Sequence, residues 1–315
     1  MNKLQLLLPV GLIGMLMTGC NVHPKMHSAG DTQSPLEVEV FKGEFATVNS
    51  FIFSNGQSIV VMDVQRKRYE AKKLLELVKK KDLPVSHILI THGHTDHFTG
   101  LALFRDEFPG AKIVVANQAI KADIKAYAMY MDSFGETDVG PVLEPSIKPK
   151  SRDNPNGFDY THSIEVLDAD SLTLDGGGTL ELTTSYKQTE APHMTTVYNK
   201  DLNALFLSDL GYNQVHHWQG DDISWQDIAN WRAELLKIKT DYSGRNPSVY
   251  PGHGDATNLN LIGAMVQYID DYRRIVTNAK SHKEAMEAMI ELYPDYGEAD
   301  FFLKYSVLNH VKEKY

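Results

Sequence analysis

Three histidines and one aspartate stand close together in the first third of this 315-residue chain. They form the run Thr91-His92-Gly93-His94-Thr95-Asp96-His97, with the pattern H-x-H-x-D-H. Imidazole nitrogens and carboxylate oxygens are common ligands of zinc and other transition metals. Gly93 lets the backbone turn sharply between two of these side chains. The spacing therefore predicts a metal-binding loop rather than a solvated polar loop.

A rigid strand end is the element that must position this loop. The apolar run Ile88-Leu89-Ile90 directly precedes the loop and is typical of a short buried strand. Three more potential ligands stand at the ends of expected strands: His193 before residues 195–199, Asp209 after residues 204–207, and His253 in a Pro-Gly-His-Gly turn after residues 248–250. Strand ends hold side chains in fixed positions, which a metal site requires.

Strands and helices alternate along the rest of the chain. Alternating or continuous apolar runs predict strands, among them residues 37–41, 47–53, 58–63, 85–90, 112–116, 164–167, 171–174 and 180–184. The first three of these are expected to form an antiparallel meander. Apolar residues at helical spacing predict helices over residues 69–81, 99–108, 118–134 and 225–239, and a mostly helical tail from residue 259.

A long segment, residues 135–157, is rich in Pro, Gly and Asp and has little apolar periodicity. Such loops in compact domains are often functional. Its aromatic flanks have two possible roles, lining a substrate cleft or packing in the core, and the sequence leaves both open. These flanking rings are Tyr127, Tyr130, Phe134, Phe158 and Tyr160.

The N-terminus has the pattern of an export signal. Residues 1–19 contain Lys3, an apolar run from Leu6 to Met17, and small residues before Cys20, which is typical of a secretory signal peptide and too short for a comfortable membrane span. Residues 20–35 are polar and are expected to form a flexible tether, so the folded domain is expected over residues 36–315.

The motif Met17-Thr18-Gly19-Cys20 resembles the lipobox of bacterial lipoproteins, although Leu is commoner where Met17 stands. The resemblance implies cleavage before Cys20, lipidation of its thiol, and a membrane-anchored protein that faces the periplasm from the inner or outer membrane. An incidental cysteine in an uncleaved leader is the alternative. Cys20 is the only cysteine, so the chain can form no internal disulfide.

The charge of the chain argues against a nucleic-acid partner. The formal net charge is −10, and the densest basic run, Lys79-Lys80-Lys81, lies at the end of an amphipathic helix. Because nucleic-acid backbones are bound by clusters of Lys and Arg, a small-molecule substrate is expected instead.

Taken in order, H-x-H-x-D-H, a lone histidine, Ser-Asp after an apolar strand, and Pro-Gly-His-Gly resemble the metallo-β-lactamase-fold hydrolase superfamily from about Val38 to Gly254. The resemblance implies an α/β fold, a four-layer αβ/βα sandwich in which two mixed sheets face each other and helices lie outside. Because the ligands extend from residue 92 to residue 253, both halves must build one site, which overrides the two domains suggested by length.

The resemblance also implies a centre of two metal ions. Its ligands would be His92, His94 and His193 for the first ion, Asp96, His97 and His253 for the second, and Asp209 as the bridge. Nitrogen and oxygen ligands without a thiolate suit two Zn²⁺ ions and also tolerate iron or manganese. A metal-bridging hydroxide would attack the carbonyl of a small ester, lactone or amide, with Asp96 orienting the nucleophile and accepting its proton.

Several alternatives remain open at this point. Asp209 stands where thiolate-using β-lactamase subclasses carry a cysteine, which excludes those subclasses, and it is more similar to the lactonase and thioesterase branches. A β-lactamase, a diiron oxidoreductase and a non-catalytic metal-binding lipoprotein are the other hypotheses, although redox-partner motifs for an oxidoreductase are absent.

The chain departs from the pattern of the family just before His193, which leaves the substrate side of the first metal site undetermined. Thr189-Glu190-Ala191-Pro192 replaces the usual Gly-rich approach to His193. Tyr212 and His216 follow Asp209 closely, and they are the expected substrate contacts unless this segment is a surface loop.

Overall fold

Two six-stranded mixed sheets form the centre of the protein in a computed structural model that describes residues 35–137, 140–220 and 223–312. The predicted signal peptide over residues 1–19, Cys20 and nearly all of the predicted tether over residues 20–35 lie outside the described residues. Residues 33–315 form one contact unit, so both halves of the sequence build the same fold.

The first sheet contains the strand that leads into the metal loop. Its strands, in spatial order, are β1 (Glu37–Lys42), β2 (Asn49–Ser54), β3 (Ile59–Met62), β4 (Val85–Leu89), β5 (Lys112–Val115) and β8 (Glu165–Val166). The first three pair antiparallel, which confirms the predicted meander, and the remaining neighbours pair parallel. Every residue of β2 and β3 is buried, as expected for strands covered on both faces.

The second sheet carries the ligands from the C-terminal half. Its strands, in spatial order, are β14 (Thr257–Asn258), β13 (Ser248–Gly254), β12 (Ala204–Asn213), β11 (Thr196–Asn199), β10 (Thr179–Thr183) and β9 (Ser171–Thr173). Only β12 and β13 pair parallel. Both are longer than predicted, so Asp209 and His253 lie inside strands rather than in turns after them.

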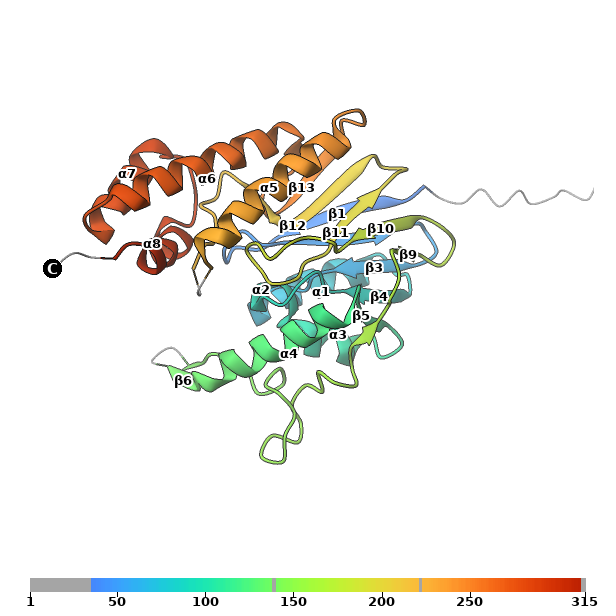
Figure 1. Ribbon diagram of the computed structural model, residues 1–315. Coiled ribbons are helices and arrows are strands. Elements are labelled where there is room, and N and C mark those ends of the chain that lie inside the picture. The colour runs from blue at the N-terminus through green and yellow to red at the C-terminus, as the bar shows by residue number, and fades with distance from the viewer. Residues whose placement is uncertain (1–34, 138–139, 221–222, 313–315) are drawn as a thin grey trace, which may run out of the picture. The chain divides into compact units, whose positions relative to one another are not determined.

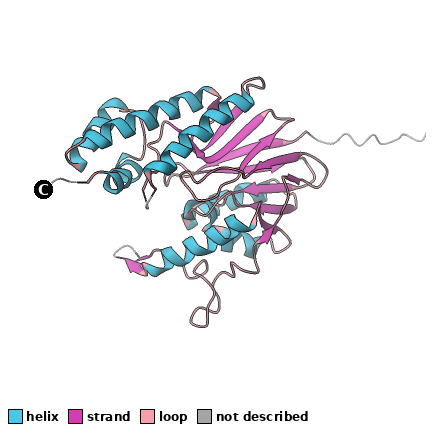
Figure 2. Cartoon of the chain, in the orientation of Figure 1, coloured by secondary structure: helices cyan, strands magenta, loops and turns pink. Residues whose placement is uncertain are grey.

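Helices cover the outer face of each sheet, which gives four layers (Figures 1 and 2). The helices on the side of the first sheet are α1 (Arg68–Lys80), α3 (Leu101–Glu107) and α4 (Gln118–Ser133), with the short α2 (Thr95–Phe98) inside the metal loop. Those on the side of the second sheet are α5 (Trp225–Tyr242), α6 (Asn260–Asn278), α7 (His282–Leu292), the π-helical turn η1 (Ala299–Leu303) and α8 (Lys304–His310). A small hairpin, β6 (Glu136–Thr137) with β7 (Gly140–Pro141), follows α4. The predicted αβ/βα sandwich is confirmed; the short elements α2, β6, β7 and β14 were not predicted.

Aromatic rings join the two sheets beneath the metal loop. Phe51 and Phe53 of β2 each lie 4.9 Å from Phe206 of β12, measured between ring centroids, and Phe206 stacks on Tyr250 of β13 at 4.6 Å. Each such pair contributes roughly 0.5–1.5 kcal/mol beyond the burial of its area. These contacts set the spacing of the strand ends that carry the ligands.

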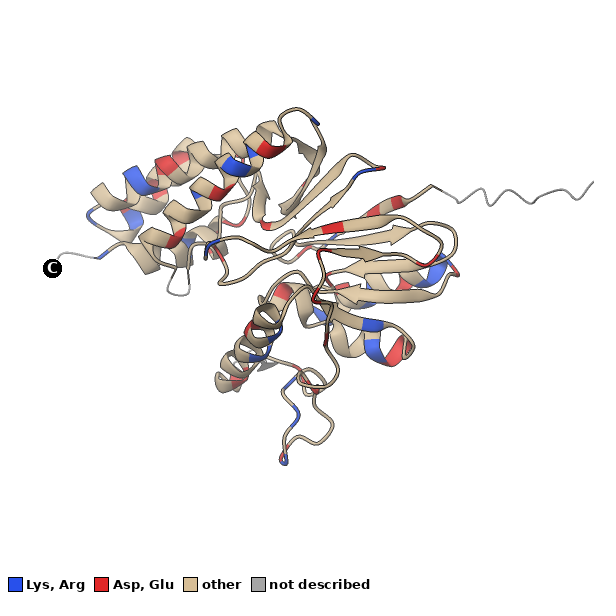
Figure 3. Ribbon diagram, turned by 45° about the vertical axis from the view of Figure 1, so that its right-hand side comes forward, with Lys and Arg blue, Asp and Glu red and all other residues tan. Residues whose placement is uncertain are grey.

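Many of the Lys, Arg, Asp and Glu residues belong to the outer helices and to loops (Figure 3). The basic run at the end of α1 is partly ion-paired, Lys79 with Glu107 at 2.8 Å and Lys81 with Glu39 at 2.9 Å. Among the described residues, no helix combines the length and apolar character needed to cross a bilayer.

Two buried histidines lie under the C-terminal helices. His216 is fully buried, and its Nδ1 lies 2.9 Å from the Tyr268 hydroxyl of α6. The ring of His217 packs 4.0 Å from the ring of Tyr268. Burial lowers the pKa of His216 to about 4 and lowers the pKa of His217 well below its usual value. Both rings are therefore neutral in the folded protein near neutral pH.

Acid should destabilise the fold partly through His216. In the unfolded chain its pKa returns to about 6.5, so its contribution to stability is complete above that pH and is lost as the pH falls toward 4. We expect His216→Asn, whose side chain can still accept the Tyr268 hydrogen bond, to reduce the loss of unfolding free energy between pH 7 and pH 5 by about 2 kcal/mol. Urea unfolding in the presence of a chelator measures this, and identical losses in variant and wild type would contradict it.

Candidate metal centre

The metal loop lies where the ends of both sheets meet. His92 follows β4, and His94 directly precedes α2, which contains Asp96 and His97. Thr195 donates its backbone N–H to the Thr91 carbonyl at 2.9 Å, which attaches the segment before β11 to the loop. The loop is therefore held by backbone contacts with the second sheet as well as by its own strand.

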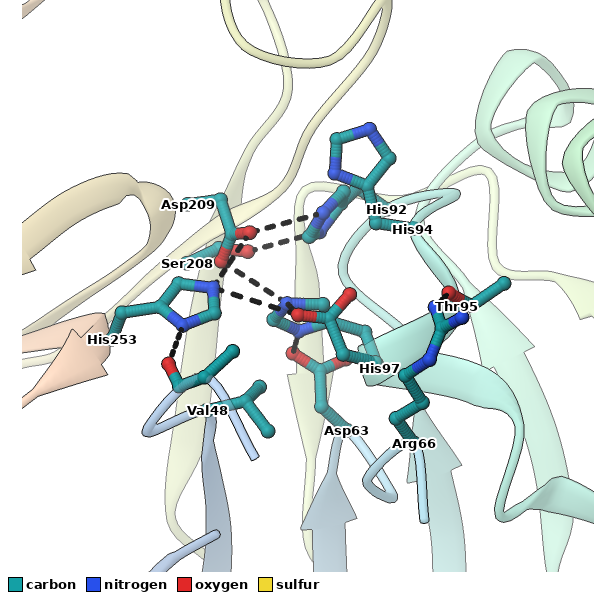
Figure 4. A network of polar contacts seen from close by, with 12 residues as sticks. Val48, Asp63, Arg66, His92, His94, Thr95, His97, Ser208, Asp209 and His253 are labelled. Atoms are coloured by element: carbon teal, nitrogen blue, oxygen red, sulfur yellow. Dashed lines mark hydrogen bonds and ion pairs between the residues drawn. The ribbon is translucent and has the colours of Figure 1, made fainter. Parts of the chain in front are cut away.

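The potential ligands form two groups that share Asp209. The group on the side of β13, called the second group because it matches the second predicted ion, consists of Asp96, His97, Asp209 and His253, with all four ligand atoms within 4.8 Å of one another. Asp209 faces two imidazoles: its Oδ1 lies 3.1 Å from His97 Nε2, and its Oδ2 lies 3.1 Å from His253 Nε2 (Figure 4). Asp96 Oδ2 completes the group, 3.7 Å from His253 Nε2.

A first group shares Asp209 and has its ligand atoms within the same 4.8 Å limit. Its members are His92, His94, Glu190 and Asp209. His92 Nε2 lies 3.5 Å from Asp209 Oδ2, and His94 Nδ1 lies 2.7 Å from Glu190 Oε1. Asp209 is thus a member of both groups, and its role as a bridge between two ions stays a prediction.

His193 belongs to neither group. Its Nδ1 is paired at 2.8 Å with Asp123 Oδ2 of α4, and its side chain is 46% exposed. The structure therefore places Glu190, rather than His193, beside His92 and His94. The sequence analysis mentioned Glu190 only as part of the unusual segment before His193. The acidic residue in that segment was the one feature of the sequence that could have indicated a further ligand.

Asp63, at the end of β3, supports the centre and was not predicted to do so. Its carboxylate accepts hydrogen bonds from the Thr91 N–H at 2.9 Å, the Thr91 hydroxyl at 2.8 Å and His97 Nδ1 at 2.8 Å. His253 Nδ1 similarly donates to the Ala46 carbonyl at 2.6 Å. Because these oxygens act as acceptors, Nδ1 carries a proton in each ring, which leaves Nε2 of His97 and of His253 as the atom that can bind a cation once it is deprotonated.

A backbone irregularity directs Asp209 inward. The register between β12 and β13 shifts at Ser208, which adopts a left-handed φ of 48°. Bulges of this kind redirect a side chain next to a functional site. The Ser208 hydroxyl lies 2.8 Å from the Thr91 hydroxyl. Gly252 packs so closely that an added Cβ would overlap Asp209 Oδ1 and the Ser208 backbone.

The side chains present fit a pair of cations. His92 Nε2, His97 Nε2, Asp209 Oδ1 and both Glu190 oxygens are buried and make no hydrogen bond with any described residue. Lone pairs that face carboxylates across such distances repel one another unless a proton or a cation lies between them. Nitrogen and carboxylate donors without thiolate suit zinc, iron or manganese.

Protonation of the imidazoles compensates the negative charges of the neighbouring carboxylates when no cation is present. Burial lowers the pKa of His97 and His253, but the neighbouring carboxylates, Asp209 foremost, outweigh burial and raise both pKa values. Asp209 shows the converse, because the three imidazoles near it lower its pKa in spite of burial. Metal binding should therefore release protons.

An aromatic cleft of about 380 Å³ opens above Asp96 and Asp209. Its lining includes Tyr127, Tyr130, Phe134, Tyr212, Trp218, Phe301 and Tyr305. This resolves the two roles left open for the rings that flank residues 135–157: those from α4 and its C-cap line the cleft, whereas Phe158 and Tyr160 are buried in the core.

Of the two expected substrate contacts, the structure brings Tyr212 to the cleft. Its hydroxyl donates to Asp209 Oδ2 at 3.4 Å, and its ring stacks on His253 at 4.7 Å. Burial and the Asp209 charge raise the pKa of Tyr212, so the phenol stays protonated and can donate. His216 points into the C-terminal core instead, where Tyr268 holds its ring.

Residues 48–253 match the family model of the metallo-beta-lactamase superfamily, a range that includes every member of both ligand groups. A probable metallo-hydrolase from Streptococcus pyogenes serotype M6 is 24% identical over 226 residues, 67% of this chain and 81% of that protein. A beta-lactamase-like protein 2 homolog from Caenorhabditis elegans is 23% identical over 278 residues, 84% of this chain and 76% of that protein. The structure of a metallo-beta-lactamase from Pontibacter korlensis is similar in fold, with a TM-score of 0.51 and 15% identity over 76% of this chain and 96% of the other.

Gly252→Ala should damage the centre, because the new methyl group would displace Asp209. We expect the substitution to destabilise the fold by about 1–3 kcal/mol and to weaken metal binding at least about tenfold. Urea unfolding and elemental analysis after dialysis measure the two effects. Gly244→Ala, in the turn after α5, has open space around its Cβ and is the matched control. Equal metal content in both variants would show that the Asp209 position is not set by this contact.

Proposed function

Because this chain belongs to the metallo-β-lactamase superfamily, we propose that it is a dinuclear metal-dependent hydrolase of small esters, lactones or amides that carry an apolar group. The observation that carries the proposal is the convergence of seven potential metal ligands, six of them buried, beside an aromatic cleft. Buried atoms of His92, His97, Glu190 and Asp209 have no hydrogen-bond partner among the described residues. Zinc is the ion expected first, and iron or manganese is compatible with the same donors.

The chain's own residues have separable roles in this reaction. Two divalent cations, when bound, would supply the Lewis acidity that polarises a carbonyl and lowers the pKa of water toward neutrality. Asp96 reaches the cleft from the floor, where its carboxylate can orient a water molecule and accept its proton. The Tyr212 phenol donates its one proton to Asp209 Oδ2 at 3.4 Å. By turning from that oxygen it could instead donate to the substrate oxygen on which negative charge develops.

The walls of the cleft indicate the kind of substrate. Aromatic rings from α4 with its C-cap and from the C-terminal segment line the cleft, so an acyl chain or ring would be bound by burial of apolar area. Arg66 is the one Lys or Arg among the described residues that line this cleft, and its guanidinium donates to the Thr95 hydroxyl.

Arg66 also favours a second candidate function, hydrolysis of β-lactams. An arginine at the rim of an otherwise apolar cleft can pair with a carboxylate on the substrate, because guanidinium and carboxylate geometries match. The activity test therefore includes β-lactams. Arg66→Met should lower the hydrolysis of β-lactams more than the hydrolysis of esters and lactones.

The metal-loaded chain should hydrolyse at least one member of a panel of aryl esters, lactones and β-lactams. His92→Ala should abolish the activity, and Tyr212→Phe should lower kcat/KM about tenfold, the effect of one lost hydrogen bond to the transition state. Tyr69→Phe is the control, since this exposed phenol lies outside the cleft. A chain that binds two ions yet hydrolyses nothing in the panel would refute the substrate class.

We also propose export and lipid anchoring through Cys20, supported by the signal-like residues 1–19 and the lipobox-like motif. The expected outcome is recovery of the full-length protein, expressed in a bacterium, in the membrane fraction. Cys20→Ala should move it to the soluble periplasmic fraction or leave an uncleaved precursor. Identical fractionation of wild type and variant would contradict lipidation at this thiol.

A further inference from the structure

Glu190 is a buried carboxylate whose surroundings do not satisfy it. Its side chain has no solvent exposure, and neither of its oxygens makes a hydrogen bond with a described residue. Its Oε1 lies 2.7 Å from His94 Nδ1 without hydrogen-bond geometry. An unsatisfied buried carboxylate is costly, so this arrangement requires a compensating positive charge or a proton.

The backbone around Glu190 is attached to the metal loop. An isolated antiparallel bridge pairs His92 with Met194, and Thr195 bonds to the Thr91 carbonyl. The Thr189 N–H donates to the Ala191 carbonyl at 3.1 Å, which closes a tight turn around Glu190. The carboxylate is therefore held beside His92 and His94 by the same contacts that hold the loop.

His193 is engaged elsewhere. The 2.8 Å ion pair with Asp123 holds its imidazole on the α4 side, half exposed to solvent. Moving that ring into the first group would break the pair and would leave the Glu190 carboxylate still buried next to it. The position beside His92 and His94 is therefore occupied by Glu190 and not by His193.

We propose that Glu190, and not His193, completes the first metal site. Each ion would then have two histidines and two carboxylates: His92, His94, Glu190 and the shared Asp209 for the first, and His97, His253, Asp96 and Asp209 for the second. This inference rests on the dinuclear centre of the proposed function and identifies one of its ligands.

The assignment changes the charge of the centre. Three carboxylates and four neutral imidazoles carry −3, whereas His193 in place of Glu190 would give −2. A third carboxylate offsets more of the charge of two divalent cations and supplies an oxygen donor, which suits Mn²⁺ and Fe²⁺ better than an imidazole does. Affinity for Mn²⁺ should therefore depend on Glu190 more strongly than affinity for Zn²⁺.

Direct metal titration distinguishes the two residues. Wild type, Glu190→Gln and the matched control His193→Gln are stripped with a chelator and titrated separately with Zn²⁺ and with Mn²⁺ in a calorimeter. We expect wild type and His193→Gln to bind two ions with similar affinities. Glu190→Gln should lose one ion or bind it about 100-fold or more weakly, with the larger loss for Mn²⁺.

Thermal unfolding separates a ligand from a merely structural residue. Metal-free Glu190→Gln should unfold at or above the wild-type Tm, because a neutral amide replaces an unsatisfied carboxylate of the same shape. The increase in Tm on adding Zn²⁺ should be smaller in the variant, since bound metal stabilises only in proportion to its affinity. Glu190→Asp keeps the charge on a shorter side chain and should recover part of the affinity.

Two results would overturn the inference: binding of both ions by Glu190→Gln with wild-type affinity, or loss of one ion in His193→Gln. A wild-type chain that binds two ions but hydrolyses none of the panel would refute the proposed function and leave the ligand assignment intact.

Discussion

The structure depends on how the fold holds together seven side chains whose charges and lone pairs repel one another. These side chains are the members of the two ligand groups. Three carboxylates and four imidazoles meet at the edge of two sheets, where several of their buried nitrogen and oxygen atoms have no hydrogen-bond partner among the described residues. Such a cluster is unfavourable by itself, because buried charges and lone pairs lose water without gaining partners. The fold holds it in position, and protons or cations neutralise it, so stability, metal binding and reactivity are coupled at this point.

The supporting contacts reach into both halves of the chain. Asn49 of β2 donates from its amide to the carbonyls of Pro251 and Gly254 at 2.9 and 2.7 Å, which fixes the strand that presents His253. Asp63 performs the corresponding task for His97. Below them the aromatic rings between the sheets keep the two strand ends at a constant distance. A displacement in either sheet would therefore reach the donors of both groups, which is why a single site needs nearly the whole fold.

The floor and the walls of the cleft come from different parts of the sequence. All ligand donors lie within residues 48–253, the range that matches the superfamily, whereas Phe301, Phe302 and Tyr305 of the C-terminal segment form one wall. The opposite wall comes from α4. The reaction class thus depends on the part of the chain shared with the family. We expect the choice of substrate to depend on the walls, because the side chains that line a pocket fix which group it accepts.

By itself the sequence determined the helices α1, α4 and α5 and the strand that leads into the metal loop, because periodic apolar residues are local patterns that adjacent residues establish. Its ordered ligand motifs, through their resemblance to a known superfamily, predicted the fold class, and the bridging role of Asp209 stays a prediction. Only the tertiary structure placed Glu190 beside His92 and His94, brought Tyr212 but not His216 to the cleft, and divided the aromatic residues near positions 135–157 between cleft and core. Local patterns favoured His193 over Glu190, did not separate Tyr212 from His216, and left two roles open for the aromatic residues. Their directions were set by partners far along the chain, Asp123 for His193, Tyr268 for His216 and the bulge at Ser208 for Asp209, and such long-range contacts leave no local periodic signal.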